Sequence, residues 1–507
     1  MYLSEFWSEW LYDPQRPWQF TSPVFAGVFI VFLALYLLIQ RPGWLRVAYV
    51  TLFSLFFYYK SSGWYVGIMV FSTLVDYWLA LWMSNTDDPR KRKLLLITSL
   101  VANLGMLGYF KYTNLFREGA ADLFRWFTGD APALIADPWD IFLPVGISFY
   151  TFQTLSYTLD VYRRSLTPTT SLLDFAFFVS FFPQLVAGPI VRAADFLPQI
   201  TRQEPFSRAD AGRAIWLIAA GAFKKIVISD YIALNFVDRV FENPLLYSGF
   251  EMLMAVYGYA LQIYCDFSGY SDMAIGLGLL MGFRLPANFL SPYQSASVRE
   301  FWRRWHMSLS TWLRDYLYIS MGGNRRGKWK TYRNLLLTML LGGLWHGAHW
   351  KFVLWGGLHG MALAVEQFFG GKSAKEPEPA APKNLGRDLL QSMGYLLGLV
   401  YTFHFVCFAW IFFRASDMAT AWQIISGIGG GFSWQEMLSV LDGYRPVFLL
   451  MTLGFILHFI PDEWEGKVSG WYAAAPVAVQ AVIAGVAFWL VMEFRSSDVL
   501  PFIYFQF

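Results

Sequence analysis

Two histidines, 40 residues apart, flank the densest cluster of positive charge in the sequence. His306 ends the run Arg-Glu-Phe-Trp-Arg-Arg-Trp-His, and His346 lies in Gly-Gly-Leu-Trp-His-Gly. Between them lies a basic turn, Gly-Gly-Asn-Arg-Arg-Gly-Lys, which ends at Lys328. A neutral imidazole is suited to general-base catalysis, and arginines pair with phosphates. The stretch therefore predicts proton-transfer chemistry beside a site for an anionic group.

His346 is predicted to lie deep in a membrane. Eleven residues separate it from Leu335, the start of the preceding apolar run, which is roughly 16 Å of helix or about half of a ~30 Å hydrocarbon core. An ionisable side chain at that depth is a functional-site hypothesis by default. Gly342, Gly343 and Gly347 surround it and leave room for close packing or for a ligand.

The other histidines are weighed in the same way. His349 lies three residues after His346, a spacing that can share a metal, but no cysteine or carboxylate cluster completes such a site, so no metal is expected. The role of His349 stays open, as does that of His359, which fits either helix packing or a pocket lining. His404 and His458 stand alone in apolar segments, where a structural role is favoured.

The segment from Phe301 to Tyr318 has the period of an amphipathic helix. On a helical wheel, Arg303, Arg314 and Ser310 lie to one side of the apolar arc. Arg304 and Asp315 lie opposite, and His306 lies at the edge of the arc. The helix is expected to lie along the cytoplasmic interface. The apolar arc consists of Trp302, Trp305, Leu309, Trp312, Leu313 and Tyr316.

The composition requires a membrane. Of 507 residues, 56% are hydrophobic and only 15% are charged, against roughly 25% in soluble proteins. Apolar runs recur along the whole chain and predict an all-α polytopic membrane protein, because lipid offers backbone groups no other partner. We expect about eleven transmembrane helices, with interfacial and re-entrant helices around a central tunnel. The main candidate spans are 24–40, 45–59, 63–83, 94–109, 144–161, 172–190, 215–228, 252–283, 352–369, 393–413, 447–460 and 474–492.

Charge asymmetry sets the expected topology. The basic loop 87–93 is assigned to the cytoplasm by the positive-inside rule, and both termini are then expected on the outer face. One membrane domain is expected, with N-terminal spans in 1–139, a core in 140–369, a cytoplasmic linker in 370–388 and C-terminal spans in 389–507. Cys265 and Cys407 lie in apolar segments and are read as buried hydrophobes.

Several motifs resemble the membrane-bound O-acyltransferase (MBOAT) family. They are Phe-Trp-Arg-Arg-Trp-His at 301–306, Gly-Gly-Asn-Arg at 322–325, Leu-Trp-His-Gly at 344–347 and upstream segments from 143, 181 and 266. The similarity runs from about 141 to 360 and is greatest to the bacterial polysaccharide and cell-envelope acylation branch, whose members include AlgI-like alginate O-acetylation and DltB-like teichoic acid D-alanylation proteins. The resemblance implies a helical fold around a tunnel in which His346 is the essential catalytic residue and His306 faces the same tunnel.

The last residues add a second match. Phe-Ile-Tyr-Phe-Gln-Phe at 502–507 fits a Phe-x-Tyr-x-x-Phe motif of polymer-acylating systems in this branch. By that resemblance, Tyr504 is expected to act as an acyl relay, and an aromatic interfacial tail is the alternative. A phenol of pKa ~10 is easier to deprotonate than an aliphatic alcohol, and its ester keeps a good leaving group.

The expected reaction moves an acyl group from a cytoplasmic thioester, most simply acetyl-CoA, towards an exported polysaccharide in the bacterial inner membrane. His346 is expected to act as general base, and His306 to position the thioester or to donate to the oxyanion. No bound cofactor and no nucleic acid are expected. The expected partners are membrane lipids and a periplasmic SGNH-type acyltransferase. The residues expected to bind the donor are Arg303, Arg304, Asn324, Arg325, Arg326 and Lys328, with support from Asp315 and Trp345.

Two alternatives stay open. One is a lipid or protein O-acyltransferase of the same family. The other belongs to a different class, a proton-coupled transporter in which His346 and His306 relay protons; the lack of visible repeated halves weakens this reading.

Overall fold

The computed structural model describes residues 10–14, 16–185, 188–202, 206–370, 385–430, 432 and 434–495, and within these ranges it contains helices and no β-strand. The described chain divides into two compact units. Unit 1 contains the residues up to Ile218 together with Tyr270–Pro286, and unit 2 contains Ala219–Gly269 and the residues from Ala287 onward. The prediction of an all-α protein is confirmed. Most of the predicted linker, and all of the C-terminal tyrosine motif, lie outside the described residues.

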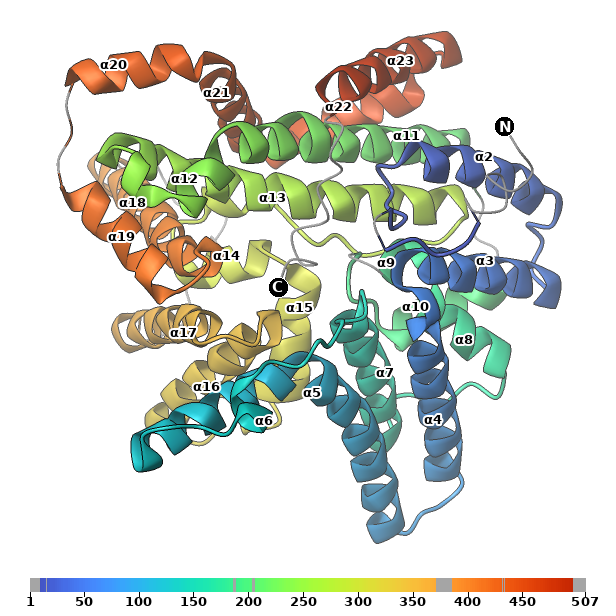
Figure 1. Ribbon diagram of the computed structural model, residues 1–507. Coiled ribbons are helices and arrows are strands. Elements are labelled where there is room, and N and C mark those ends of the chain that lie inside the picture. Colours follow the sequence, from blue (N-terminus) through green and yellow to red (C-terminus); the bar gives the residue numbers. More distant parts are fainter. Residues whose placement is uncertain are drawn as a thin grey trace. The chain divides into compact units, whose positions relative to one another are not determined.

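Unit 1 is built on long helices with clear end signals. α5 begins after Asp88, whose carboxylate accepts a hydrogen bond from the Arg90 N–H, and it ends at Gly129 in the left-handed conformation. α4, α5 and α7 pack side by side (Figure 1). The helices of this unit are α2 (Pro23–Leu38), α3 (Trp44–Ser62), α4 (Val66–Ser84), α5 (Pro89–Thr128), α6 (Ala133–Ala136), α7 (Ile147–Tyr162), α8 (Leu172–Ser180), α9 (Phe182–Leu185) and α10 (Ala193–Thr201).

A buried polar cluster joins α4 to α5. The Asp76 carboxylate accepts hydrogen bonds from Ser99 Oγ at 2.6 Å and from Asn103 Nδ2 at 2.9 and 3.0 Å, and all three side chains are fully buried. A buried carboxylate is tolerated where its oxygens are satisfied in this way. The cluster therefore fixes the register of the two helices.

Unit 2 holds both histidines of the predicted site. α11 (Arg208–Ala222) starts in unit 1 and ends here, and α13 (Gly249–Leu280) starts here and ends in unit 1. The π-helix η2 (Phe223–Asp230) continues α11. The other helices of this unit are α12 (Asp238–Glu242), α14 (Val298–Arg304), α15 (Met307–Trp312), α16 (Lys328–His346), α17 (Trp350–Phe369), α18 (Leu385–Arg414), α19 (Met418–Gly429), α20 (Trp434–Gly443), α21 (Arg445–Phe459), α22 (Asp462–Ala474) and α23 (Val477–Phe494), with short π and 3-10 turns between them.

Four stretches of the described chain are long and apolar enough to cross a membrane, or five if α20 and α21, which meet at a bend of 87°, count as one span. The four are Trp44–Ser84, Pro89–Thr128, Ser392–Arg414 and Val477–Phe494. The expected count of about eleven spans is therefore not confirmed. Several expected spans form helices that are short, such as the 16 residues of α2 and the 9 of α8. The central tunnel stays a prediction.

The prediction of one continuous amphipathic helix from Phe301 to Tyr318 is wrong. α14 ends at Arg304, Trp305 is extended, and His306 is left-handed with φ 43° and ψ 55°. α15 then continues into the π-helix η6 (Leu313–Tyr318). The apolar arc is nonetheless buried as expected, with every one of its six side chains at most 9% exposed. The helical wheel thus identified the buried face although the backbone breaks at its histidine.

Candidate active site

The hairpin of α16 and α17 carries the catalytic candidate on a glycine-lined contact (Figure 1). A Cβ on Gly343 would lie 2.2 Å from the backbone oxygen of Phe352, and one on Gly356 would lie 2.2 Å from that of Met339. The ring of Phe352 lies against Gly347, and a Cβ on Gly347 would be 2.0 Å from Phe352 Cε2. Only glycine permits so close an approach. The sequence left two roles for these glycines, close packing or room for a ligand. Gly343 and Gly347 serve close packing.

His346 is the last residue of α16 and is only 3% exposed. Its imidazole makes edge contacts with Trp355 at 5.0 Å and Phe413 at 5.3 Å between ring centroids, and with its neighbour Trp345 at 5.0 Å. These rings come from α16, α17 and α18. The imidazole is therefore held by an aromatic cage, and water has little access to it.

His306 is fully buried between α14 and α15, which lie outside the candidate membrane spans. Its Nδ1 lies 3.1 Å from Oδ1 of Asn288, and its ring contacts Phe267 at 4.7 Å. Burial lowers the pKa of His306 to about 3, so the imidazole is neutral at physiological pH. The indole of Trp345 lies 6.2 Å from the His306 ring, which makes Trp345 a contact of both histidines. The structure thus brings together His306, Trp345 and His346.

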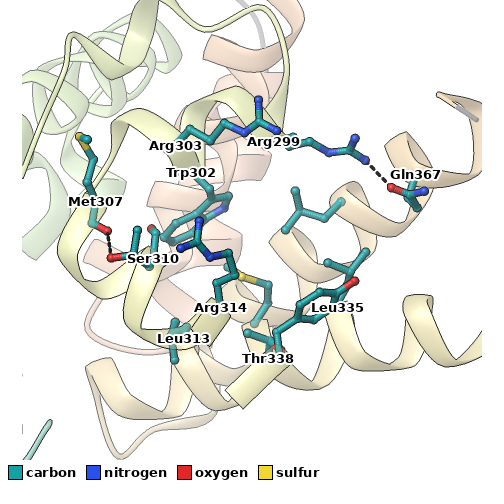
Figure 2. Close-up of a pocket in the computed structure, with 14 residues that line it drawn as sticks. Arg299, Trp302, Arg303, Met307, Ser310, Leu313, Arg314, Leu335, Thr338 and Gln367 are labelled. Atoms are coloured by element: carbon teal, nitrogen blue, oxygen red, sulfur yellow. Dashed lines mark hydrogen bonds between the residues drawn. The ribbon is translucent and has the colours of Figure 1, made fainter. Parts of the chain in front are cut away.

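A cavity of about 810 Å³ adjoins these helices. Figure 2 shows Arg299, Arg303 and Arg314 around its wall, with Leu335 and Thr338 of α16 opposite, and the Arg299 guanidinium donating to Gln367 Oε1 at 2.8 Å. The volume falls in the usual range of ligand pockets. The cavity therefore combines three cations with an apolar wall. Its lining consists of Arg299, Trp302, Arg303, Met307, Ser310, Thr311, Leu313, Arg314, Tyr318, Leu335, Thr338, Met339, Leu363 and Gln367.

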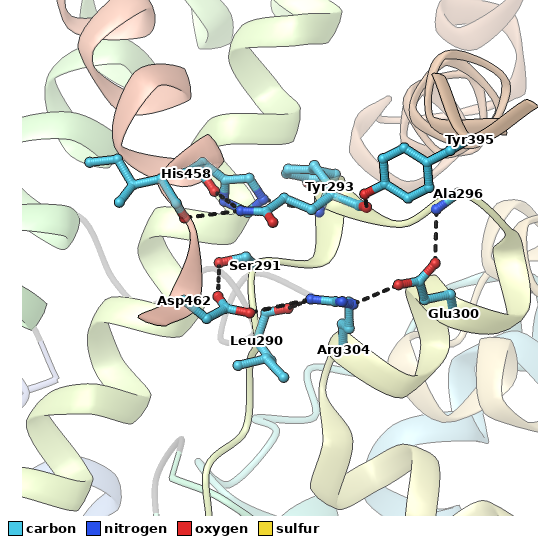
Figure 3. Close-up of polar contacts among 11 residues, drawn as sticks. Leu290, Ser291, Tyr293, Ala296, Glu300, Arg304, Tyr395, His458 and Asp462 are labelled. Atoms are coloured by element: carbon cyan, nitrogen blue, oxygen red, sulfur yellow. Dashed lines mark hydrogen bonds and ion pairs between the residues drawn. The ribbon is translucent and has the colours of Figure 1, made fainter. Parts of the chain in front are cut away.

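The predicted donor-binding residues divide into three groups. Arg303 lines the cavity. Arg304 instead pairs with Glu300 at 3.0 Å and with Asp462 at 3.5 Å, in the polar network of Figure 3. The residues of the basic turn are exposed and do not line the cavity: Asn324, Arg325, Arg326 and Lys328.

The remaining predicted residue, Asp315, pairs at 2.6 Å with Arg314, which lines the cavity. His349, whose role was open, caps α17 by accepting a hydrogen bond from the Lys351 N–H at 3.2 Å. His359, also open, accepts a hydrogen bond at Nδ1 from Nε1 of Trp302 at 3.2 Å and lies 4.9 Å from Trp355.

Sequence reasoning missed several residues of the site. Arg314 and Ser310 shared a side of the wheel with Arg303, and this was a usable signal that all three line one wall. Asn288 lies in an irregular segment 18 residues before His306 and gave no signal. Trp355 and Phe413 read as ordinary apolar positions because only the fold brings them to His346.

Comparison with known proteins identifies the family of the chain. The model of the MBOAT, membrane-bound O-acyltransferase family matches residues 147–376, a range that contains both histidines and the cavity. A probable alginate O-acetylase of Pseudomonas aeruginosa is 41% identical over 435 residues, covering 82% of this chain and 76% of that protein. A peptidoglycan O-acetyltransferase of Helicobacter pylori is 35% identical over 442 residues, covering 81% and 80%. A teichoic acid D-alanyltransferase of Bacillus subtilis is 28% identical over 290 residues, covering 54% and 70%.

The chain belongs to the membrane-bound O-acyltransferase family. It is a multi-pass membrane protein and an acyltransferase. The resemblance found in its histidine motifs is confirmed.

Proposed function

We propose that this protein is an O-acetyltransferase that takes an acetyl group from acetyl-CoA on the cytoplasmic side of the bacterial inner membrane, for O-acetylation of an exported polysaccharide. The observation that carries the proposal is the placement of His346 in an aromatic cage at the end of α16, the helix that also forms a wall of the arginine-lined cavity. Relatives named for alginate and for peptidoglycan O-acetylation support the acceptor class.

The cavity suits a phosphate-bearing thioester. Arg299, Arg303 and Arg314 offer guanidinium forks for the phosphates of the donor. Thr338 of the cavity wall precedes His346 by eight residues on α16, which is roughly 12 Å along the helix. A donor whose phosphates bind the arginines therefore needs an extended arm to bring its thioester to the imidazole. The pantetheine arm of acetyl-CoA has this form.

The proposed chemical step uses His346 as the general base. His346 removes the proton of the attacking hydroxyl, whose oxygen forms a bond to the thioester carbonyl carbon. The tetrahedral intermediate then expels the thiolate, which takes up a proton and leaves as free CoA. The aromatic cage excludes water, which favours transfer over hydrolysis.

For the hydroxyl, we propose Tyr504 as the acyl relay, as the tail motif implies. Its aryl ester would pass the acetyl group to an SGNH-type acyltransferase outside the membrane, with both termini of this chain on that face. Tyr504 lies outside the described residues, so the support for this step is the sequence motif alone.

The test uses membranes that contain the full chain, incubated with radiolabelled acetyl-CoA. We expect the wild type and Tyr504→Phe to differ in the label that stays on the protein: the wild type retains base-labile label, and Tyr504→Phe does not. His346→Ala should lose both label and polymer acetylation. Normal polymer acetylation by well-expressed His346→Ala would refute the role of the histidine. Normal acetylation by Tyr504→Phe would refute only the relay.

A further inference from the structure

Asn288 makes an unusually complete set of contacts around His306. Its side-chain Oδ1 lies 3.1 Å from His306 Nδ1, 3.2 Å from the backbone N of Ser308 and 2.9 Å from Ser308 Oγ. Its backbone oxygen accepts a hydrogen bond from the Met307 N–H at 2.9 Å. Both His306 and Asn288 are at most 1% exposed. The asparagine therefore holds the left-handed histidine and the two residues that follow it.

These contacts determine which nitrogen of His306 carries the proton. A backbone N–H can only donate, so the Asn288 atom that meets Ser308 N must be the amide oxygen and not its nitrogen. That oxygen can only accept, so His306 Nδ1 donates to it at 3.1 Å. Ser308 Oγ lies 3.5 Å from the same nitrogen, but its one proton goes to Asn288 Oδ1 at the shorter distance of 2.9 Å. A neutral imidazole has one donor and one acceptor nitrogen. His306 Nε2 therefore has a lone pair and no proton.

We infer that Asn288 is a positioning residue that locks His306 in the Nδ1–H tautomer, so that Nε2 accepts a hydrogen bond from the acyl donor. This inference rests on the proposed function for the identity of the donor. Met307, the next residue along the chain, lines the cavity in which the proposed donor binds. The amide N–H groups of the pantetheine arm of acetyl-CoA are donors of the required kind.

The tautomer decides between the two roles that the sequence left for His306. An unprotonated Nε2 repels a developing oxyanion and cannot stabilise it, so oxyanion donation is excluded for this nitrogen. Positioning of the thioester remains. The left-handed backbone of His306, with φ 43°, fits this assignment, because a non-glycine residue keeps such a strained conformation only where surrounding contacts impose it.

The first test compares steady-state kinetics of purified full-length variants with acetyl-CoA as the varied substrate. Asn288→Leu removes the acceptor, and we expect kcat/KM for acetyl-CoA to fall about tenfold, mostly through KM. Asn288→Asp keeps an acceptor oxygen and should retain most of the wild-type KM. Asn235→Leu is the matched control, since Asn235 makes a single local hydrogen bond to the backbone of Tyr231. An unchanged KM in Asn288→Leu, or equal loss in Asn288→Asp and Asn288→Leu, would overturn the inference.

The second test reads the tautomer directly and needs no substrate. Nitrogen NMR of the wild-type protein with labelled histidine, with His306→Gln to assign the signal, should show the proton on Nδ1 of His306. A proton on Nε2 would overturn the inference even if the variants fail to fold. Failure of the proposed function is a separate outcome. In that case the wild type would show the expected spectrum but no turnover of acetyl-CoA.

Discussion

Gly343→Ala is the sharpest test of how the fold positions His346. The new Cβ would lie 2.2 Å from Phe352 O and 3.1 Å from Gly356 Cα, so it falls about 1.2 Å short of the 3.4 Å at which ordinary contact begins. Both obstructing atoms belong to the backbone of α17, so no side-chain rotation relieves the clash, and α16 must move away. His346 lies three residues further along α16, on the same face of the helix.

We expect two consequences of that movement. Overpacking of this size lowers the free energy of unfolding of a protein by about 1–3 kcal/mol. A displacement of about 1 Å at a catalytic group costs on the order of 100-fold in turnover. Acetyl-CoA-dependent polymer acetylation measures the second effect, and a thermal unfolding curve of the purified protein measures the first.

Gly357→Ala is the matched control, since its Cβ would meet only Leu340 Cδ2, at an ordinary 3.5 Å. It adds the same methyl group to the same hairpin and should leave both measurements within error of the wild type. If Gly343→Ala keeps full turnover and the same unfolding temperature as Gly357→Ala, then the close contact of α16 and α17 does not set the position of His346.

Three further predictions follow from charges in unit 2. Arg303→Ala should raise the KM for acetyl-CoA about tenfold, whereas Arg325→Ala, in the exposed turn, should leave it unchanged; equal effects in steady-state kinetics would remove the cavity as the phosphate site. Lys225→Met removes the ion pair of the buried Asp266 carboxylate and should lower the free energy of unfolding by about 3–5 kcal/mol. Chemical unfolding in detergent measures this, and a decrease below about 1 kcal/mol would contradict it. The pKa of His306 is about 3 in the folded protein, below its ordinary value of 6.5. Protonation therefore favours the unfolded chain, and the contribution of this ring to stability should fall as pH drops below about 6.5. His306→Gln should lack that part of the decrease in unfolding temperature, and an identical pH dependence in both proteins would refute it.

The sequence predicted which residues form the site better than how the backbone holds them. Helical periodicity identified the buried face of the segment around His306, and it placed Arg303 and Arg314 on one side, because both properties depend only on local spacing. The break at His306 was not predictable from spacing, since its left-handed backbone is stabilised by Asn288, a tertiary contact 18 residues away. For the same reason, the pairing of Arg304 with Asp462, 158 residues away, was missed.

The expected span count is not confirmed, and one physical reason is that a run of apolar residues has the same composition in a membrane and in a protein core. α7 illustrates the ambiguity, since most of its side chains are buried, including polar ones such as Gln153 and Thr154. Length and hydropathy cannot separate a helix enclosed by protein from one that faces lipid. The burial of the side chains can separate the two cases, and burial is known only from the folded chain.

The tryptophans between the histidines also limit proton transfer from one imidazole to another. Trp345 contacts His306 and His346, and Trp355 contacts His346 and His359. An indole has an N–H donor and no acceptor nitrogen, so it cannot take a proton from one imidazole and pass it to the next. Protons therefore cannot pass from one histidine to the next through these indole contacts. Under the proposed function, the proton that His346 takes from the attacking hydroxyl therefore does not reach His306 or His359 through these indoles.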